Sequence, residues 1–462
     1  MGEQQERVDV LRKTFRTGKT RSVAWRKQQL QAFLRMIEDS AEDIRAATYK
    51  DMHRSSIECE LADIKSVTIP CKEALHAVEQ WMKPMSVSAS YRQMPSSASI
   101  RPEPLGVVLI LGTWNVALSS TLGPVIEAIA AGNCVVIKPS EITPACADVM
   151  VKMVTKYLDP EAISIVAGGP EVAQSLLEEQ FDHIFFTGSE RIGRLVYEAA
   201  ARKLTPVTLE LGGKSPCVID DTANLEVAVR RILWAKDTNC GQICVAPDYI
   251  LVFKSVAKEF YETIKKIYAE FYPEGKPGER YGRIVNMRNT DRLMEMLEED
   301  ESIRGKVLVG GESDREDRFI APTVFTGTLP EAKVMQEEIF GPLLPTFEIN
   351  DLDEAISFIT AKPKPLAAYL FSKNAKAIDQ YINETTSGNT MINDVMWHYF
   401  EGALPFGGVG SSGIGCAHGY HGFKTFSHMK GILHKSGRPL FDASIRYPPM
   451  DENKEWYLKK FF

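Results

Sequence analysis

The segment Gly106-Val-Val-Leu-Ile-Leu111 begins the pattern that decides the fold of this chain. A second apolar segment runs from Leu122 to Ala131, and a third, Cys134-Val-Val-Ile137, follows it after two residues. The first and third segments are short, continuous runs of β-branched residues and leucine, which is typical of strands buried on both faces. The middle segment has the length of a helix. A strand, a helix and a strand in succession predict an α/β fold with parallel strands.

The same alternation continues along most of the chain. It predicts further strands at 163–166, 183–186, 206–211, 249–253 and 306–309, and helices at 146–157, 171–179, 190–202 and 256–271. A second alternating unit starts near Lys214 and continues to about Asn393. Sheets built in this way carry helices on both faces and bind ligands at the carboxyl ends of their strands. We therefore expect an α/β protein with two doubly wound parallel-sheet domains.

Two regions depart from this alternation. Residues 8–82 have a helical pattern, in which Leu30, Phe33 and Ile37 recur at helical spacing. Residues 84–104 are rich in serine and carry alternating apolar side chains, which predicts an extended ribbon that stands away from the main body. The sequence thus adds a small β element to the two domains.

The bulk composition narrows the class of protein. A chain of 462 residues exceeds the size of a single core, and its net charge of -7 argues against nucleic-acid binding. The polar N-terminus predicts no signal peptide, and the interrupted stretch 105–137 is a poor membrane span, so no membrane anchor is expected. Eight scattered cysteines without a C-x-x-C pair indicate a reducing compartment, and we expect a cytoplasmic protein.

One cysteine lies in a setting that favours chemistry. Cys244 follows the Gly-containing turn of Asn239-Cys-Gly-Gln-Ile-Cys244 and precedes a predicted strand. A thiol there can face a cleft, and nearby backbone N–H groups can stabilise its thiolate. The alternative is a buried structural cysteine, because free cysteines are among the most buried residues. Cys240, four residues earlier, competes as the nucleophile.

Glu210 is the candidate general base. It lies at the end of an apolar strand, between Leu209 and Leu211 and just before two glycines. A carboxylate among leucines should have a raised pKa, which suits a base that works near neutral pH. The alternative is a surface glutamate on a strand edge.

Asn115 follows the strand that ends at Leu111, so its amide could donate to an oxyanion at the carboxyl end of that strand. Alone, it is equally an ordinary turn residue.

Two loops are candidates for binding a dinucleotide. Gly188, in Phe186-Thr-Gly-Ser-Glu-Arg-Ile-Gly193, lets the backbone approach a phosphate at a helix N-terminus. The spacing G-x-x-x-x-G differs from both the Rossmann fingerprint and the P-loop. Lys138 and Glu141 end a neighbouring strand and could hold the ribose hydroxyls of adenosine; the alternative is a solvated loop.

The histidines do not predict a metal site. His418 and His421 are three residues apart near Cys416, but no second ligand pair follows at a regular spacing. We expect no bound metal.

Together these motifs resemble the aldehyde dehydrogenase family along most of the chain. The family's ordered motifs match the following segments: Lys138–Glu141, Leu209–Lys214, Gly241–Cys244, Glu337–Pro342 and Pro405–Gly408. The closest branch resembles the class 3, fatty-aldehyde-like group. Its characteristic segments are matched at Cys244–Tyr249, Ser412–Gly415, His418-Gly419 and Thr425–His428. This sequence departs from the family pattern around Asn115, where Thr113 precedes Trp114 and Val116-Ala117 follow.

The resemblance implies roles for individual residues. Cys244 would be the nucleophile, Glu210 the base that activates the deacylating water, and Asn115 with the Cys244 N–H the oxyanion hole. The residues implied to contact NAD are Trp114, Lys138, Glu141, Gly188, Ser189, Gly193, Leu211, Glu338 and Phe340. NAD should be preferred and NADP tolerated. The implied domains are 1–83 with 103–211 for the dinucleotide, 212–424 for catalysis, and 84–102 with 425–462 for bridging and oligomerisation.

The implied reaction is oxidation of an aldehyde to a carboxylic acid through a cysteine thioester. The residues assigned to the substrate are Trp234, Trp397, Tyr399 and His418, and the absence of Arg or Lys from 393–405 favours an uncharged aliphatic or aromatic aldehyde. Alternatively, these aromatic residues pack a dimer interface. Two rival functions are a coenzyme A-dependent acylating enzyme and a non-catalytic relative. The class 3 resemblance also predicts a homodimer.

Overall fold

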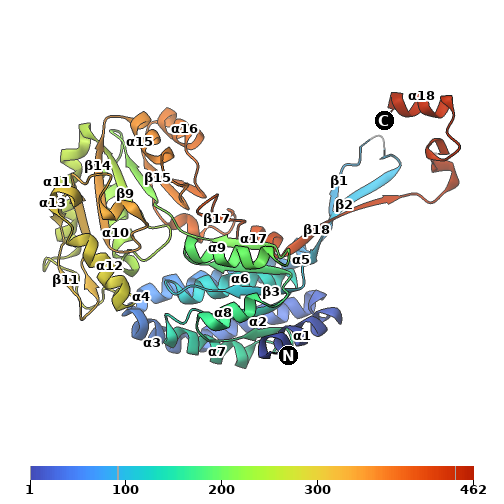
Figure 1. Ribbon diagram of the computed structural model, residues 1–462, viewed down its shortest axis with the longest axis horizontal. Coiled ribbons are helices and arrows are strands. Elements are labelled where there is room, and N and C mark those ends of the chain that lie inside the picture. The colour runs from blue at the N-terminus through green and yellow to red at the C-terminus, as the bar shows by residue number, and fades with distance from the viewer. Residues whose placement is uncertain (1, 91–92, 443, 462) are drawn as a thin grey trace.

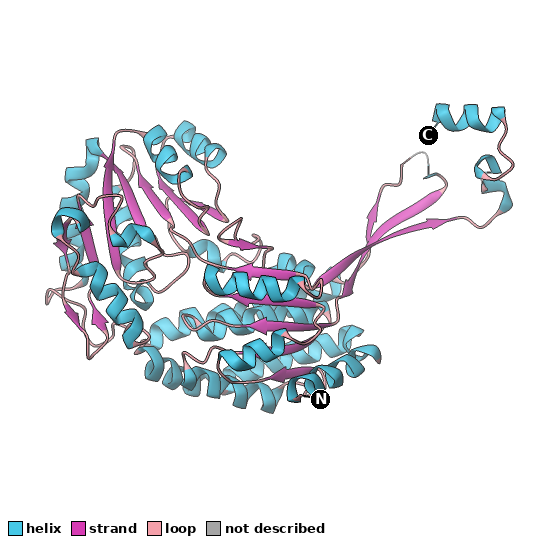
Figure 2. Ribbon diagram, in the orientation of Figure 1, coloured by secondary structure: helices cyan, strands magenta, loops and turns pink. Residues whose placement is uncertain are grey.

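The computed structural model describes residues 2–90, 93–442 and 444–461. Two α/β bodies lie side by side, and a long ribbon extends from one of them (Figure 1). Figure 2 shows helices on both faces of the two large sheets, as the alternating pattern predicts. The predicted fold class is confirmed.

The predicted N-terminal helical region is a series of separate helices that cover the first sheet. Short turns divide it, and a π-helical turn, Glu60–Lys65, joins two of the helices. The helices of this region are α1 (Glu3–Arg16), α2 (Val23–Asp39), α3 (Ala41–Met52), α4 (Ser56–Cys59) and α5 (Ser66–Trp81).

The first sheet has six strands in the order β17-β7-β6-β3-β4-β5. The strands are β3 (Val107–Leu111), β4 (Cys134–Lys138), β5 (Ile163–Ile165), β6 (His183–Thr187), β7 (Val207–Glu210) and β17 (Gly413–Ile414). The helices between them are α6 (Ala117–Ala131), α7 (Pro144–Tyr157), α8 (Pro170–Leu177) and α9 (Glu190–Ala201). Strands β3 to β7 are parallel, and every residue of β3 and β4 is buried, as their apolar runs predict.

Helix α6 begins at Ala117, five residues before the predicted start at Leu122, and contains Pro124. Pro124 is the eighth residue of the helix, so the helix lacks one interior backbone hydrogen bond there. The prediction treated the polar residues before Leu122 as a loop, but they are buried and helical here.

The second sheet has seven strands in the order β10-β13-β14-β9-β8-β15-β16. They are β8 (Pro216–Ile219), β9 (Tyr249–Phe253), β10 (Lys306–Val309), β13 (Thr323–Thr326), β14 (Leu343–Ile349), β15 (Ala367–Phe371) and β16 (Asn389–Ile392); a separate hairpin pairs β11 (Ser313–Asp314) with β12 (Phe319–Ile320). The helices are α10 (Leu225–Asp237), α11 (Lys254–Phe271), α12 (Met287–Leu297), α13 (Glu301–Arg304), α14 (Lys333–Gln336), α15 (Leu352–Thr360) and α16 (Ala375–Glu384). The sheet is parallel except for β10, which runs antiparallel to β13.

Residues 413–425 cross back from the second body to the first. Strand β17 pairs antiparallel with β7, and Gly413 lies opposite Glu210. Helix α17 (Gly419–Thr425) packs on α6, and Phe423 belongs to the first core. The predicted boundary at 424 therefore groups with the catalytic domain a strand and a helix that pack on the other domain.

The predicted ribbon forms a three-stranded antiparallel sheet, β1-β2-β18. Its strands are β1 (Met85–Val87), β2 (Ser96–Pro104) and β18 (Ser427–Lys435). It stands away from the body and leads to the terminal helix α18 (Glu452–Phe461), as Figure 1 shows. Residues 91 and 92 of the predicted ribbon lie outside the described residues.

Candidate active site

Cys244 lies in the connection between α10 and β9. The chain there turns through Asn239, Cys240 and Gly241, which have φ values of 51°, 53° and 67°. Left-handed conformations at two residues other than glycine are unusual and change the chain direction sharply. Cys244 is partly exposed beyond this turn, whereas the side chain of Cys240 is only 1% exposed. The accessible thiol of the two is therefore Cys244.

The Cys244 thiol is neutral in the structure as it stands. Burial raises its pKa to about 12, and the nearby charges of Glu338 and Glu210 act in the same direction. The backbone N–H groups of Cys244 and Val245 lower the pKa but do not outweigh burial. The sulfur thus lies among two carboxyl groups and two backbone donors, and it needs a proton acceptor before it can act as a thiolate.

Glu210 ends β7 and is 5% exposed. Neither carboxyl oxygen has a hydrogen-bond partner among the described residues. Burial raises the pKa well above its usual value, and the charge of Glu127 raises it further. The predicted raised pKa is confirmed, and its largest cause is the burial of the carboxyl group. A carboxyl group in this state holds its proton to a higher pH than an exposed glutamate does.

Asn115 is buried in the loop that joins β3 to α6. Its side-chain Nδ2 donates to the carbonyl oxygen of Gln242 at 3.0 Å, two residues before Cys244. Its own carbonyl oxygen accepts hydrogen bonds from Arg54 and from the Asn239 amide, the latter at 2.9 Å. The unusual residues beside Asn115 therefore leave its side chain close to the loop that carries Cys244.

Sequence reasoning missed the residues that hold these two loops together. Arg54 is 1% exposed, forms an ion pair with Asp63, and donates to Asn239 Oδ1 at 2.9 Å. Asp63 in turn accepts from the Leu118 N–H at 3.3 Å. No local motif marks these residues, since they come from segments up to 185 positions apart.

The predicted dinucleotide residues lie at the carboxyl edge of the first sheet. Gly188 and Ser189 precede α9, and a methyl group at Gly188 would lie 2.5 Å from the Phe186 ring. Gly193 packs in the same way against the side chain of Leu211, at 2.7 Å. Because Gly188 has no side chain, a phosphate can approach the backbone N–H groups at 188–189 beside the N-terminus of α9. This arrangement fits a pyrophosphate group.

Lys138 and Glu141 lie at the end of β4, next to this edge. Lys138 Nζ is 3.0 Å from Glu141 Oε2, and Glu141 is exposed. A lysine and a carboxylate offer a donor and an acceptor to a ribose diol, so the donor set fits an adenosine ribose.

Glu338 and Phe340 reach the site from the second body. The Phe340 ring packs edge-to-face on Trp114 with centroids 5.2 Å apart. Burial raises the pKa of Glu338 to about 8, and a methyl group at Gly212 would overlap the Glu338 carboxyl group. These residues and Cys244 thus lie where the two sheets face each other, and they fit a nicotinamide nucleoside between the domains.

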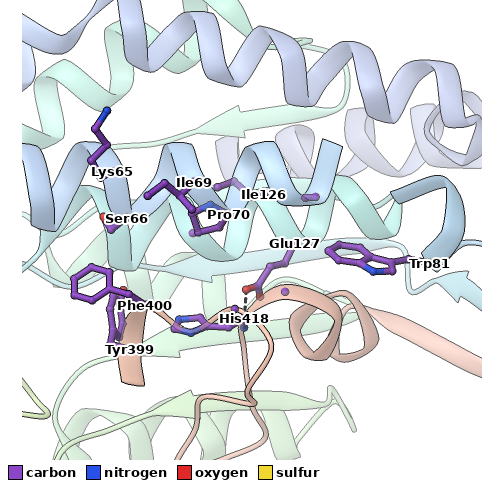
Figure 3. A pocket seen from close by; sticks show the side chains of 14 residues that line it. Lys65, Ser66, Ile69, Pro70, Trp81, Ile126, Glu127, Tyr399, Phe400 and His418 are labelled. Atoms are coloured by element: carbon purple, nitrogen blue, oxygen red, sulfur yellow. Dashed lines mark hydrogen bonds between the residues drawn. The ribbon is translucent and has the colours of Figure 1, made fainter. Parts of the chain in front are cut away.

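The four residues predicted for the substrate form two groups. Trp234 and Trp397 stack with ring centroids 5.7 Å apart. The rings of Tyr399 and His418 pack edge-to-face with centroids 5.0 Å apart, and both residues line a pocket that Glu127 also lines. Figure 3 shows Tyr399, His418 and Glu127 along one wall of this pocket. Glu127 was not among the predicted site residues, although a lone acid in an apolar helix is itself a signal.

The described residues contain neither a metal-binding cluster nor a membrane-spanning helix. No group of three or more His, Cys, Asp or Glu side chains there could hold a metal ion. No helix in the described ranges is long and apolar enough to cross a membrane.

The fold and the site fit a class of two-domain oxidoreductases, in which a thiol lies within electrostatic reach of a buried carboxyl group at the edge of a parallel sheet. The aldehyde dehydrogenase family model matches residues 3–432, and the chain belongs to that family. It is an NAD(P)-dependent aldehyde dehydrogenase.

Individual relatives agree over nearly the whole chain. Aldehyde dehydrogenase family 3 member A2 from Pongo abelii is 44% identical, with 98% of this chain and 93% of that protein covered. The "aldehyde dehydrogenase, dimeric NADP-preferring" of Canis lupus familiaris is 42% identical, with 97% and 98% covered. A substrate-bound structure of Staphylococcus aureus AldH superimposes with a TM-score of 0.95 at 40% identity, covering both chains completely. These similarities support neither a coenzyme A-dependent acylating enzyme nor a non-catalytic relative.

Proposed function

We propose that the protein oxidises an uncharged aldehyde to the carboxylic acid through a thioester on Cys244, with Glu210 as the base for hydrolysis. The observation that carries this proposal is the position of the partly exposed Cys244 thiol within electrostatic reach of Glu210 and Glu338. Cys240, the competing thiol, is buried, and burial raises its pKa well above the usual value.

The chain's own groups account for each step. The Cys244 sulfur adds to the aldehyde carbon after its proton passes to a neighbouring carboxylate. The side-chain amide of Asn115 has two N–H groups, and only one is used on Gln242, so the other can donate to the oxyanion with the Cys244 N–H. A nicotinamide held there would supply the acceptor for the hydride whose loss turns this adduct into a thioester. Glu210 then takes a proton from the water that attacks the thioester.

NAD is the proposed cofactor. Gly188, Ser189 and Gly193 would hold the pyrophosphate, Lys138 and Glu141 the adenosine ribose. The residues proposed to surround the nicotinamide end are Trp114, Leu211, Glu338 and Phe340. The exposed Glu141 carboxylate would repel a 2′-phosphate, so NAD is preferred over NADP. Because the canine relative is named as NADP-preferring, we propose a preference and not exclusion.

The proposed substrate is an aliphatic or aromatic aldehyde of medium length. The rings of Trp397, Tyr399 and His418 and the stacked Trp234 offer apolar area near Cys244. Substitution of Trp397 by alanine tests this part, with kcat/KM measured over an aldehyde series. A strong preference for a semialdehyde that carries a carboxylate would contradict it.

We also propose a homodimer in a reducing, cytoplasmic compartment. The three-stranded ribbon ends in the outer strands β1 and β18, and a free strand edge favours pairing with another chain. Beyond it, Leu440 is 86% exposed and Trp456 is 53% exposed, which favours cover by a second copy. The compartment is supported by eight cysteines that are all free.

The experiment that tests the central proposal compares three proteins in NAD-dependent hexanal oxidation, with and without coenzyme A. Cys244→Ala should abolish activity and keep NAD binding, while Cys240→Ala, the matched control, should keep most activity. The reverse result would show that Cys240, and not Cys244, is the nucleophile. A requirement for coenzyme A would show that the thioester is released by acyl transfer and not by hydrolysis.

A further inference from the structure

Glu127 is a carboxyl group in the middle of an apolar helix. Every other residue of α6 is uncharged, and the Glu127 residue is only 8% exposed. Its Oε1 accepts the His418 backbone N–H at 2.8 Å, but Oε2 has no hydrogen-bond partner among the described residues. Burial of a carboxyl group with one unsatisfied oxygen is costly, so its presence calls for a reason in function.

The surroundings are shaped to hold this carboxyl group. Gly422 of α17 lies directly against it, and a methyl group at that position would overlap the carboxyl atoms. In Figure 3, Glu127 points from α6 toward the loop of His418, to which a dashed line connects it. His418 itself has a φ of 75°, which turns its N–H toward the carboxyl group.

Glu127 also lines the outer pocket, together with Tyr399. Its charge acts on Glu210, whose two oxygens are buried without hydrogen-bond partners in the described part of the chain. One segment links the surroundings of the two carboxyl groups: Gly413 lies opposite Glu210 in the pairing of β17 with β7, and the chain continues from there to His418, whose N–H donates to Glu127. Three carboxyl oxygens of these two groups thus have no hydrogen-bond partner among the described residues.

Burial raises the pKa of Glu127 to about 8. The titratable groups near it in the packed elements are Glu210, Tyr399, Cys416 and His418, and Lys65 lines the same pocket. Burial lowers the pKa of His418 to about 4, so its ring is neutral near pH 7. Glu127 and Glu210 therefore titrate as a coupled pair, in which the charge on Glu127 raises the pKa of Glu210.

We propose that Glu127 is a proton-relay residue, which receives the proton that Glu210 removes from the hydrolytic water and releases it into the outer pocket. The proposal rests on the proposed roles of Cys244 and Glu210. The water oxygen bonds to the thioester carbon, and the C–S bond breaks with its electron pair on sulfur. One of the two water protons restores the Cys244 thiol. The acid leaves as its carboxylate, so the second water proton must leave the site, and Glu127 carries it. The proton that the thiol gave up when the thioester formed also leaves, so each turnover releases two protons.

The test is Glu127→Gln, which keeps the size of the side chain and an acceptor for the His418 N–H but cannot carry the proton. We expect steady-state kcat to fall about tenfold in dilute buffer, and added imidazole to restore it as a diffusible base. The acid limb of the kcat profile should move to lower pH, because the charge on Glu127 no longer raises the pKa of Glu210.

Asp237→Asn is the matched control. It also removes a carboxyl group whose pKa burial raises, and the asparagine still accepts from the Tyr272 hydroxyl. The control should keep the wild-type kcat and pH profile. Glu127→Ala, which removes the buried polar atoms altogether, serves where the glutamine variant does not fold, with the same expectations.

Wild-type kcat and pH profile in the Glu127 variants would overturn the relay. A loss of kcat that neither responds to imidazole nor moves the pH profile would assign Glu127 a structural role only, and would overturn it too. Glu210→Gln separates the two proposals: a burst of NADH there supports the role of Glu210 independently. Without that burst the proposed function fails, and the relay with it.

Discussion

The Arg54→Met substitution tests how much the buried Arg54–Asp63 ion pair contributes to stability and, separately, to catalysis. The Arg54 and Asp63 side chains are 1% and 0% exposed, and Arg54 also donates to Asn115 O and to Asn239 Oδ1. Removal of one partner of a buried ion pair costs about 3–5 kcal/mol, because the other charge stays buried without compensation. The single variant should therefore unfold at a clearly lower urea concentration, followed by tryptophan fluorescence.

The pH dependence of this loss has a defined sign. Without Arg54, the pKa of the Asp63 carboxyl group rises further above its unfolded value, so the folded state binds more protons than the unfolded state. The stability deficit should grow as the pH rises above the unfolded pKa and shrink as the pH is lowered.

A double variant, Arg54→Met with Asp63→Leu, distinguishes the two roles. It leaves no buried charge, so most of the lost stability should return. Its kcat should stay roughly 100-fold low, because the Asn115 loop has still lost its anchor and small misplacements of reacting groups are expensive. A single variant as stable as the wild type, or a double variant with full kcat, would refute this reasoning.

The remaining predictions concern the site and the assembly. Glu210→Gln should give a burst of about one NADH per site followed by slow turnover in stopped-flow absorbance, and a missing burst would mean that Glu210 acts before the thioester forms. Alkylation of Cys244 by iodoacetamide should quicken about tenfold per pH unit between roughly pH 7 and 9, because burial raises its thiol pKa to about 12 and the thiolate fraction grows with pH; a flat profile would contradict this. Glu141→Ala should lower the ratio of kcat/KM with NAD to kcat/KM with NADP, and an unchanged ratio would count against a contact between Glu141 and the ribose. Removal of residues 436–462 should shift the sedimentation coefficient toward that of a monomer, and an unchanged coefficient would mean that these residues play no part in assembly.

Local patterns in the sequence were enough to predict most of the architecture. The apolar runs at 107–111 and 134–138 read as buried strands, because a parallel strand covered on both faces needs apolar residues at every position. The serine-rich ribbon was also predicted from its alternation and low apolar content. Cys244 and Glu210 were proposed from the sequence because each lies in a short motif next to a strand, and the neighbouring residues indicate its chemical role.

Contacts between distant segments decided those features of the fold and the site that local patterns do not show. The pairing of β17 with β7, and the bonds from Arg54 to Asn115 and Asn239, join residues that share no local pattern. The sequence by itself therefore determined the class of fold and indicated the proposed nucleophile and the proposed base. Only the tertiary structure decided that Glu127 lines the pocket and that its charge acts on Glu210, because burial and charge interactions depend on what surrounds a side chain in space.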